Sequence, residues 1–237
     1  MNKVDEQAAF ILKSQPFNET SSIHQVFTEE FGILSLLSKG SRTSKSKYGS
    51  SLQAFNALSI SWRGKAELKT ITSVEQSDYI QQLTGNALFC GFYINELLLN
   101  FLHKHDPHPE LFSEFKTIVK QLGATDNIEA NLRQFEKKLL NAIGYAVLLD
   151  YDAITEQAIS ADMHYHYQPQ QGATITALSE QANVYSGSML INLNHNQLSN
   201  KTELRQAKRL MRLLIDYHLG GKILKSRELF GKIKTNH

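Results

Sequence analysis

The feature that most constrains the fold is a change in hydrophobic periodicity at residue 78. Before it, short apolar or alternating runs are separated by turn-forming residues, a pattern typical of β-strands. After it, apolar residues recur at helical spacing. The strand-like runs are 8–12, 22–27, 33–37, 55–60 and 67–71. They favour an α+β chain in which a small barrel over 1–78 is followed by a mainly helical domain over 79–237.

The second part should contain several helices and a small β-hairpin. Asp78 is a candidate N-cap for a largely buried helix reaching Leu102. The other expected helices are 109–123, beginning with a proline, 127–144, and a last helix from a Ser199 or Asn200 cap to Gly220. Helical spacing is lost over 150–180, where alternating residues around 163–167 and a turn at 168–172 predict the hairpin.

Charge is distributed unevenly along the chain. The net charge is only +2, but residues 201–237 carry 10 Lys/Arg against 3 Asp/Glu, whereas residues 79–200 carry 6 against 12. The first basic zone comprises Lys39, Arg42, Lys45, Lys47, Arg63, Lys65 and Lys69. The second comprises Arg205, Lys208, Arg209, Arg212, Lys222, Lys225, Arg227, Lys232 and Lys234. Such clusters predict a polyanion binder, although a solvated basic face would have the same composition.

The first basic zone includes a loop of small and basic residues over 38–51, expected to be flexible. A barrel with a basic loop at its rim is how oligonucleotide-binding (OB) folds hold single strands, with cations along the phosphates and aromatic rings stacked on the bases. Tyr48, Phe55 and Trp62 are the candidate stacking residues. Phe55 alternates with polar neighbours, which favours a core position for that ring.

The sequence lacks the motifs that identify several classes of enzyme, metal-binding protein and membrane protein. The single cysteine, Cys90, excludes an internal disulfide and a multi-cysteine zinc site, and a reducing cytoplasmic location is expected. The sequence contains no phosphate-binding glycine-lysine loop, dinucleotide motif or catalytic serine elbow, and no signal peptide or membrane span is expected. Histidines at 103, 105, 108, 164 and 166 lack a recognised metal-ligand spacing. We therefore expect no metal, no cofactor and no catalytic residues.

Six ordered stretches resemble the RecO family of bacterial recombination mediators. They are residues 27–32 (FTEEFG), 37–42 (LSKGSR), 52–55 (LQAF), 93–98 (YINELL), 135–140 (FEKKLL) and 218–230 (HLGGKILKSRELF). The resemblance covers essentially the whole chain and implies an OB barrel followed by a helical domain. Some members carry a four-cysteine zinc site in the second domain. The region 150–180 has no cysteine here, so that zinc site is not carried over.

The resemblance implies non-enzymatic work on DNA. Family members bind single-stranded DNA, bind the acidic C-terminal tail of single-stranded-DNA-binding protein, associate with RecR, anneal complementary strands and help to load RecA. Both basic zones would contact DNA, and a nucleoid-associated location follows.

The resemblance also implies a partner-tail site on the expected helix 127–144. Arg133 matches a family position implicated in tail binding, and Leu132, Phe135 and Leu139 would form an apolar slot beside it. Alternatively, Arg133 is a surface residue paired with Glu129 or Glu136 at helical spacing.

Two other functions stay open from the residues alone. An RNA-binding accessory protein would have the same basic barrel, because cation clusters do not distinguish the sugar. A metal-dependent nuclease would combine the histidines with Asp106 or Asp162.

Overall fold

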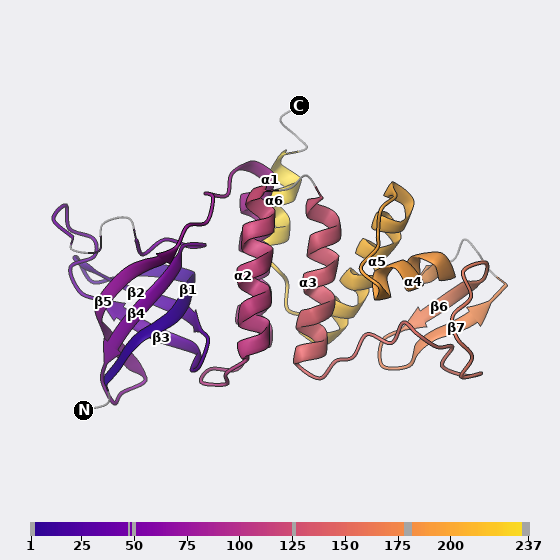
Figure 1. The fold of residues 1–237 in the computed structure, drawn as a ribbon, viewed down its shortest axis with the longest axis horizontal. Helices are drawn as coiled ribbons and strands as arrows, with labels where there is room; N and C mark the ends of the chain where they lie inside the picture. Colours follow the sequence, from indigo (N-terminus) through magenta and orange to yellow (C-terminus); the bar gives the residue numbers. More distant parts are fainter. Residues whose placement is uncertain (1–2, 47, 49–50, 125–126, 178–181, 234–237) are drawn as a thin grey trace. The chain divides into compact units, whose positions relative to one another are not determined.

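A computed structural model describes residues 3–46, 48, 51–124, 127–177 and 182–233. The chain forms two compact units, of which unit 1 is residues 1–126 with 224–237 and unit 2 is residues 127–223 (Figure 1). The C-terminal segment therefore returns to the unit that contains the N-terminus.

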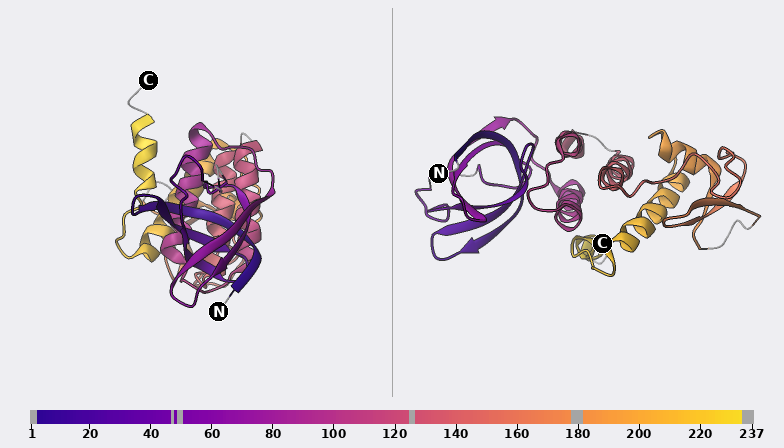
Figure 2. Two further views of the ribbon diagram at one scale, coloured as in Figure 1. Left: turned by 90° about the vertical axis from the view of Figure 1, so that its left-hand side faces the viewer. Right: turned by 90° about the horizontal axis from the view of Figure 1, so that it is seen from below.

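Unit 1 contains a closed five-stranded barrel, seen end-on in the right panel of Figure 2. Its strands are β1 (Lys3–Phe17), β2 (Ser21–Thr28), β3 (Gly32–Ser38), β4 (Ala57–Arg63) and β5 (Leu68–Asp78). The order around the barrel is β1-β2-β3-β5-β4, with β4 pairing back onto β1. Only the β3–β5 pair is parallel. This arrangement confirms the predicted OB-type barrel.

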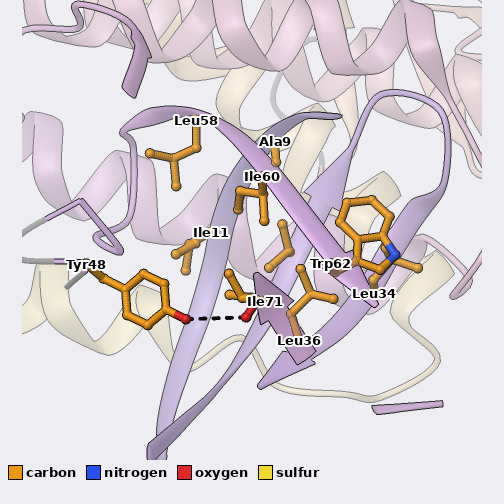
Figure 3. Packing of buried hydrophobic residues seen from close by; sticks show 10 residues of the cluster. Ala9, Ile11, Leu34, Leu36, Tyr48, Leu58, Ile60, Trp62 and Ile71 are labelled. Carbon is orange, nitrogen blue, oxygen red and sulfur yellow. Dashed lines mark hydrogen bonds between the residues drawn. The ribbon is translucent and has the colours of Figure 1, made fainter. Parts of the chain in front are cut away.

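The barrel interior contains two of the three rings that the sequence offered as base-stacking residues. Trp62 is 1% exposed, and the Tyr48 hydroxyl donates to the Ile71 carbonyl oxygen at 3.3 Å (Figure 3). Phe55 is also buried, with its ring against Gly91. The stacking prediction is therefore wrong for Tyr48 and Trp62, because both rings fill the core instead of facing solvent.

Three helices belong to unit 1: α1 (Gly85–Phe101), α2 (Pro109–Ala124) and α6 (Ser226–Ile233). Phe10 and Phe27 point out of the barrel and pack on Phe112 and Phe115 of α2, with ring centroids 5.0–6.1 Å apart. The buried amide of Asn95 in α1 donates to the Leu12 carbonyl at 2.9 Å. These contacts extend the compact unit well past residue 78.

The first helix begins later than the sequence predicted. Asp78 is the last residue of β5, and the N-cap of α1 is Thr84. The Asp78 carboxylate instead lies 2.7 Å from Lys120 and 3.2 Å from Lys116, and hydrogen bonds from these two lysines lower its pKa to about 2. Within α1, Gly91 allows a close approach, because a Cβ there would lie 2.7 Å from the Phe55 ring.

The C-terminal helix α6 is fixed to α1 by one carboxylate. Glu96 accepts hydrogen bonds from the backbone N–H groups of Lys225 (2.9 Å) and Ser226 (2.8 Å) and from the Ser226 hydroxyl (2.5 Å). A negative charge at a helix N-terminus satisfies free N–H donors and complements the helix dipole. Leu224, just before the helix, is 1% exposed.

Unit 2 combines three helices with a small sheet. The helices are α3 (Ile128–Ala142), α4 (Gly187–Asn194) and α5 (Lys201–Leu219). The sheet has the order β7-β6-β8, from β6 (His164–Gln168), β7 (Gly172–Thr176) and β8 (Val184–Ser186). The predicted caps of α5 are confirmed, since the Asn200 side chain accepts from Glu203 N at 2.8 Å and Gly220 has a left-handed backbone.

The predicted hairpin is present as β6 and β7, and β8 adds a third strand. The buried carboxylate of Asp152 fastens the preceding loop to the outer edge of β7. It accepts from the backbone N–H groups of Ile154 (2.9 Å), Thr155 (2.8 Å) and Ile175 (2.5 Å). Burial acts to raise the pKa of Asp152, but these backbone donors outweigh it and the pKa is lowered. One carboxylate thus holds the loop and the edge strand together in the region 150–180, which contains no cysteine.

A buried histidine links three barrel strands and makes stability depend on pH. The His24 ring nitrogens lie 2.8 Å from the hydroxyls of Ser14 and Ser38, and burial lowers the pKa of His24 to about 4. The folded state therefore favours the neutral ring, while the unfolded chain takes up a proton below about pH 6.5. The neutral His24 ring therefore contributes fully to the free energy of unfolding above that pH, and this contribution is lost as the pH falls towards 4.

We expect the free energy of unfolding to decrease across this window by at most about 1.4 kcal/mol for each pH unit. His24→Asn, which keeps hydrogen-bonding groups without this titration, should flatten the dependence in urea unfolding experiments. An equally steep decrease in the variant would assign the effect to other groups.

Candidate nucleic-acid interface

A groove of about 730 Å³ lies on unit 1 at the turn between β1 and β2 and the end of β3. It is lined by Phe17, Asn18, Glu19, Thr20, Ser21, Leu37, Lys39 and Gly40. The Phe17 side chain is 41% exposed, and Lys39 is exposed. The groove thus combines an accessible aromatic ring with a cation. Proteins bind single-stranded nucleic acids with these two groups, because the ring stacks on a base and the cation pairs with a phosphate.

The basic loop is fastened beside this groove. Arg42 donates from its backbone N–H to the Thr20 carbonyl (3.0 Å) and from its guanidinium to the Asn18 carbonyl (2.7 Å). Tyr48 enters the barrel core from the same loop. The described part of the loop is therefore held against the β1–β2 turn, in contrast to the freely flexible segment that its composition predicted. Arg42 and Lys45 are exposed, whereas Lys47 lies outside the described residues.

Sheet register brings Arg63 to the neighbourhood of the groove. Leu37, which lines the groove, pairs with Thr70 on β5, and Thr70 pairs with Arg63 on β4. Residues paired in this way point to the same face, and two strand spacings amount to about 10 Å. Lys65 is exposed in the next turn, and Lys69 is half-buried, with its ammonium 3.4 Å from the Ala66 carbonyl.

Glu67 is the one Asp or Glu between Lys39 and Lys69, and it pairs with residues outside the first basic zone. Glu67 lies 2.9 Å from the His105 ring and 3.0 Å from the Lys104 ammonium, and hydrogen bonds from His105 and then Lys104 lower its pKa to about 2. His108 pairs with Asp106 at 3.3 Å. Throughout the described ranges, no three His, Cys, Asp or Glu side chains are grouped so that they could hold a metal ion.

The second basic zone is divided between the two units. Lys225 and Arg227 belong to unit 1 with the barrel, whereas Arg205, Lys208, Arg209, Arg212 and Lys222 belong to unit 2. Lys234 and the side chain of Lys232 lie outside what the structure describes. The sequence grouped these residues because they are close along the chain, but the return of residues 224–237 to unit 1 separates them.

The cations of α5 have different roles. Arg209 bonds the Val184 carbonyl and lies 4.7 Å from the centre of the Tyr185 ring, so it joins α5 to β8. Lys208 pairs with Glu129 at 3.4 Å and Arg212 with Asp216 at 3.6 Å. Both pairs are exposed, and such pairs contribute only about 0–1 kcal/mol, so a phosphate can compete for these cations. Arg205 is also exposed.

The predicted partner-tail residues lie together on α3. Leu132, Phe135 and Leu139 are buried, and Arg133 is 6% exposed. The Arg133 guanidinium lies 2.8 Å from the Glu136 carboxylate, which is fully buried. The helical pairing considered from sequence is therefore present, but as a buried pair and not a surface one.

Sequence reasoning missed the role of Lys137 on the same helix. Its ammonium donates to the carbonyls of Leu193 (2.8 Å) and Asn194 (2.6 Å), which end α4. Burial lowers the pKa of Lys137. A lysine flanked by another lysine carries no sequence signal for such a contact.

Comparison with known families agrees with this architecture. The family described as Recombination protein O N terminal matches residues 1–80, and Recombination protein O C terminal matches residues 82–228. The chain belongs to the RecO family.

Relatives in this family align over nearly the full length. DNA repair protein RecO of Dechloromonas aromatica is 38% identical over 98% of both chains. The proteins of the same name from Coxiella burnetii and Aliivibrio fischeri are also 38% identical, over 96% and 94% of this chain and 98% and 94% of their own lengths. These RecO relationships assign the chain to DNA repair and recombination. None of the helices in the described ranges is long and apolar enough to span a membrane.

Proposed function

We propose that this protein is a non-enzymatic recombination mediator that binds single-stranded DNA through the barrel groove. The observation that carries the proposal is the groove itself, where exposed Phe17 lies with Lys39 beside the fastened Arg42. We assign different roles to the two parts of the chain, and residues 1–78 bind the single strand. Residues 79–237 bind partners and add a basic DNA contact through α5 and the segment that follows it.

The proposal extends to annealing and exchange on coated DNA. Two complementary strands repel each other, and neutralising the phosphates on both lowers that repulsion. To replace single-stranded-DNA-binding protein on coated DNA, the mediator must bind that protein. We propose that its acidic tail is bound by Arg133 with Leu132, Phe135 and Leu139. An arginine suits a terminal carboxylate because its donors match two oxygens at once. Association with RecR and assistance in loading RecA complete the proposed role.

Removing two loop cations tests the DNA-binding part. Lys39→Ala with Lys45→Ala should weaken binding of a labelled oligothymidine and reduce the salt dependence of its affinity. Each lost phosphate contact removes about 0.7 from the slope of log affinity against log salt concentration, so two contacts remove about 1.4. Arg42 is kept in this variant because its guanidinium also holds the β1–β2 turn.

The matched control is Lys116→Ala with Lys120→Ala on α2. It removes the same charge from the same unit, and these lysines belong to α2 and pair with Asp78, the last residue of β5. Fluorescence anisotropy over a salt series measures both variants. Equal slopes in the loop variant, the control and the unmodified protein would place the DNA elsewhere. Competition with a matched RNA oligonucleotide checks the preference for DNA.

A further inference from the structure

Unit 2 presents an aromatic stack on its surface. The rings of Tyr145 and His218 are parallel within 11°, with centroids 3.9 Å apart, and Tyr217 meets His218 edge-on at 5.2 Å. Tyr145 and Tyr217 are 45% and 47% exposed. These exposed rings are grouped at one place on the surface, and grouped exposed apolar groups are a feature of binding sites.

Two helix ends build the stack and leave it open. Gly144, at φ +83°, follows α3, and the Tyr145 N–H donates to the Leu140 carbonyl at 2.8 Å. Gly220 ends α5 in the left-handed conformation, just beyond His218. Apart from the adjoining chain, no described residue comes within 4 Å of where a Cβ would stand on Gly144, Gly220 or Gly221. Bare backbone therefore borders the rings, and a ligand can approach closely.

The chemistry around the stack suits a base with its phosphate. Burial lowers the pKa of His218, which favours the neutral ring. The facing sides of the His218 and Tyr145 rings cover each other, so the outer side of the exposed Tyr145 ring is the π-surface open to a base. Lys222 follows within the same unit and is exposed. The acid of this turn, Asp216, lies 3.6 Å from the Arg212 guanidinium. An accessible π-face and an exposed cation are the two groups with which proteins hold single-stranded nucleic acids.

We propose that the Tyr145–His218 stack holds a nucleobase of single-stranded DNA, with Lys222 on the adjoining phosphate. This is a second contact for the strand, separate from the barrel groove, and it rests on the proposed DNA-binding function. It also supplies the base stacking that the buried rings of Tyr48 and Trp62 cannot.

Tryptophan fluorescence tests the contact directly. The only native tryptophan, Trp62, is 1% exposed, so Tyr145→Trp adds an accessible reporter at the stack. Saturating oligothymidine should quench the added fluorescence strongly, and an abasic oligomer of equal length should quench it much less. Tyr151→Trp is the matched control, because Tyr151 is 61% exposed in the same unit but is not one of the rings of the stack. It should show little quenching.

Affinity provides the second measurement. Tyr145→Ala should lose about 5- to 150-fold in affinity for oligothymidine, the range expected for one stacked base, while Tyr145→Phe should bind normally. Urea unfolding checks that both variants are folded. If oligothymidine binds but leaves the Tyr145→Trp fluorescence unchanged, the stack inference is wrong and the groove proposal survives. If the unmodified protein binds no oligothymidine, the proposed function itself fails.

Discussion

Arg133→Met is expected to destabilise the protein by about 3–5 kcal/mol, the usual cost of leaving one partner of a buried ion pair without the other. The pair is Arg133 with Glu136, 2.8 Å apart, and the glutamate is fully buried. Urea unfolding monitored by circular dichroism measures the loss. Because the cost comes from the carboxylate that stays behind, Arg133→Met with Glu136→Leu should recover most of the stability. A double variant as unstable as the single one would contradict this explanation.

The double variant also separates folding from partner binding. Arg133→Glu would place two carboxylates together in a buried position, so a loss of tail binding could not be distinguished from unfolding. The Met–Leu variant keeps the site apolar and removes the cation. We expect it to fold, to bind oligothymidine with unchanged affinity, and to lose capture of a labelled acidic tail peptide. If the folded double variant binds the peptide normally, the receptor lies elsewhere. If it loses both ligands equally, peptide and DNA share one surface.

Glu96→Ala is expected to release the C-terminal helix from α1. The variant removes a carboxylate that accepts from two backbone N–H groups and one hydroxyl of residues 225 and 226. Hydrogen bonds to a charged group each contribute about 1.5–3 kcal/mol, so local opening of α6 should become at least 10-fold more frequent. Limited trypsin digestion measures this, because Lys225 and Arg227 are cleavage positions at the start of the helix.

Glu110→Ala is the control for the Glu96 experiment. Glu110 lies in the first turn of α2, so it shares the favourable position near a helix N-terminus but none of the three contacts. Its digestion at 225 and 227 should match that of the unmodified protein. Equal digestion of all three proteins would show that burial of Leu224, and not the carboxylate, holds α6.

Local sequence patterns predicted most of the barrel, because each strand's alternation depends only on neighbouring residues. The same alternation contained the signal that Trp62 points inward, since it follows Leu58 and Ile60 at steps of two. The prediction that Trp62 stacks on bases is wrong because this alternation places its ring in the barrel core. The start of α1 was misplaced because Asp78 resembles a cap in isolation, whereas in the fold β5 continues through it.

The features that sequence could not predict depend on distant partners. The short helix α6 needs Glu96 from α1, and the aromatic stack needs Tyr145 and His218 from two different helix ends. Arg133 and its neighbours matched the family by position, but only the fold shows that the pair with Glu136 is buried. Likewise, the second basic zone is contiguous in sequence, and only the return of the chain to unit 1 divides it.

That return has a consequence for the order of synthesis. All five barrel strands lie in the first 78 residues, so the barrel can close while the rest of the chain is still being translated. The surface of α1 that Glu96 offers to α6 stays uncovered until residues 127–223 have been made, because Leu224 and Ser226 follow them. A chain that ends before residue 224 would contain the barrel and the small sheet, yet its first unit would lack the helix that covers α1.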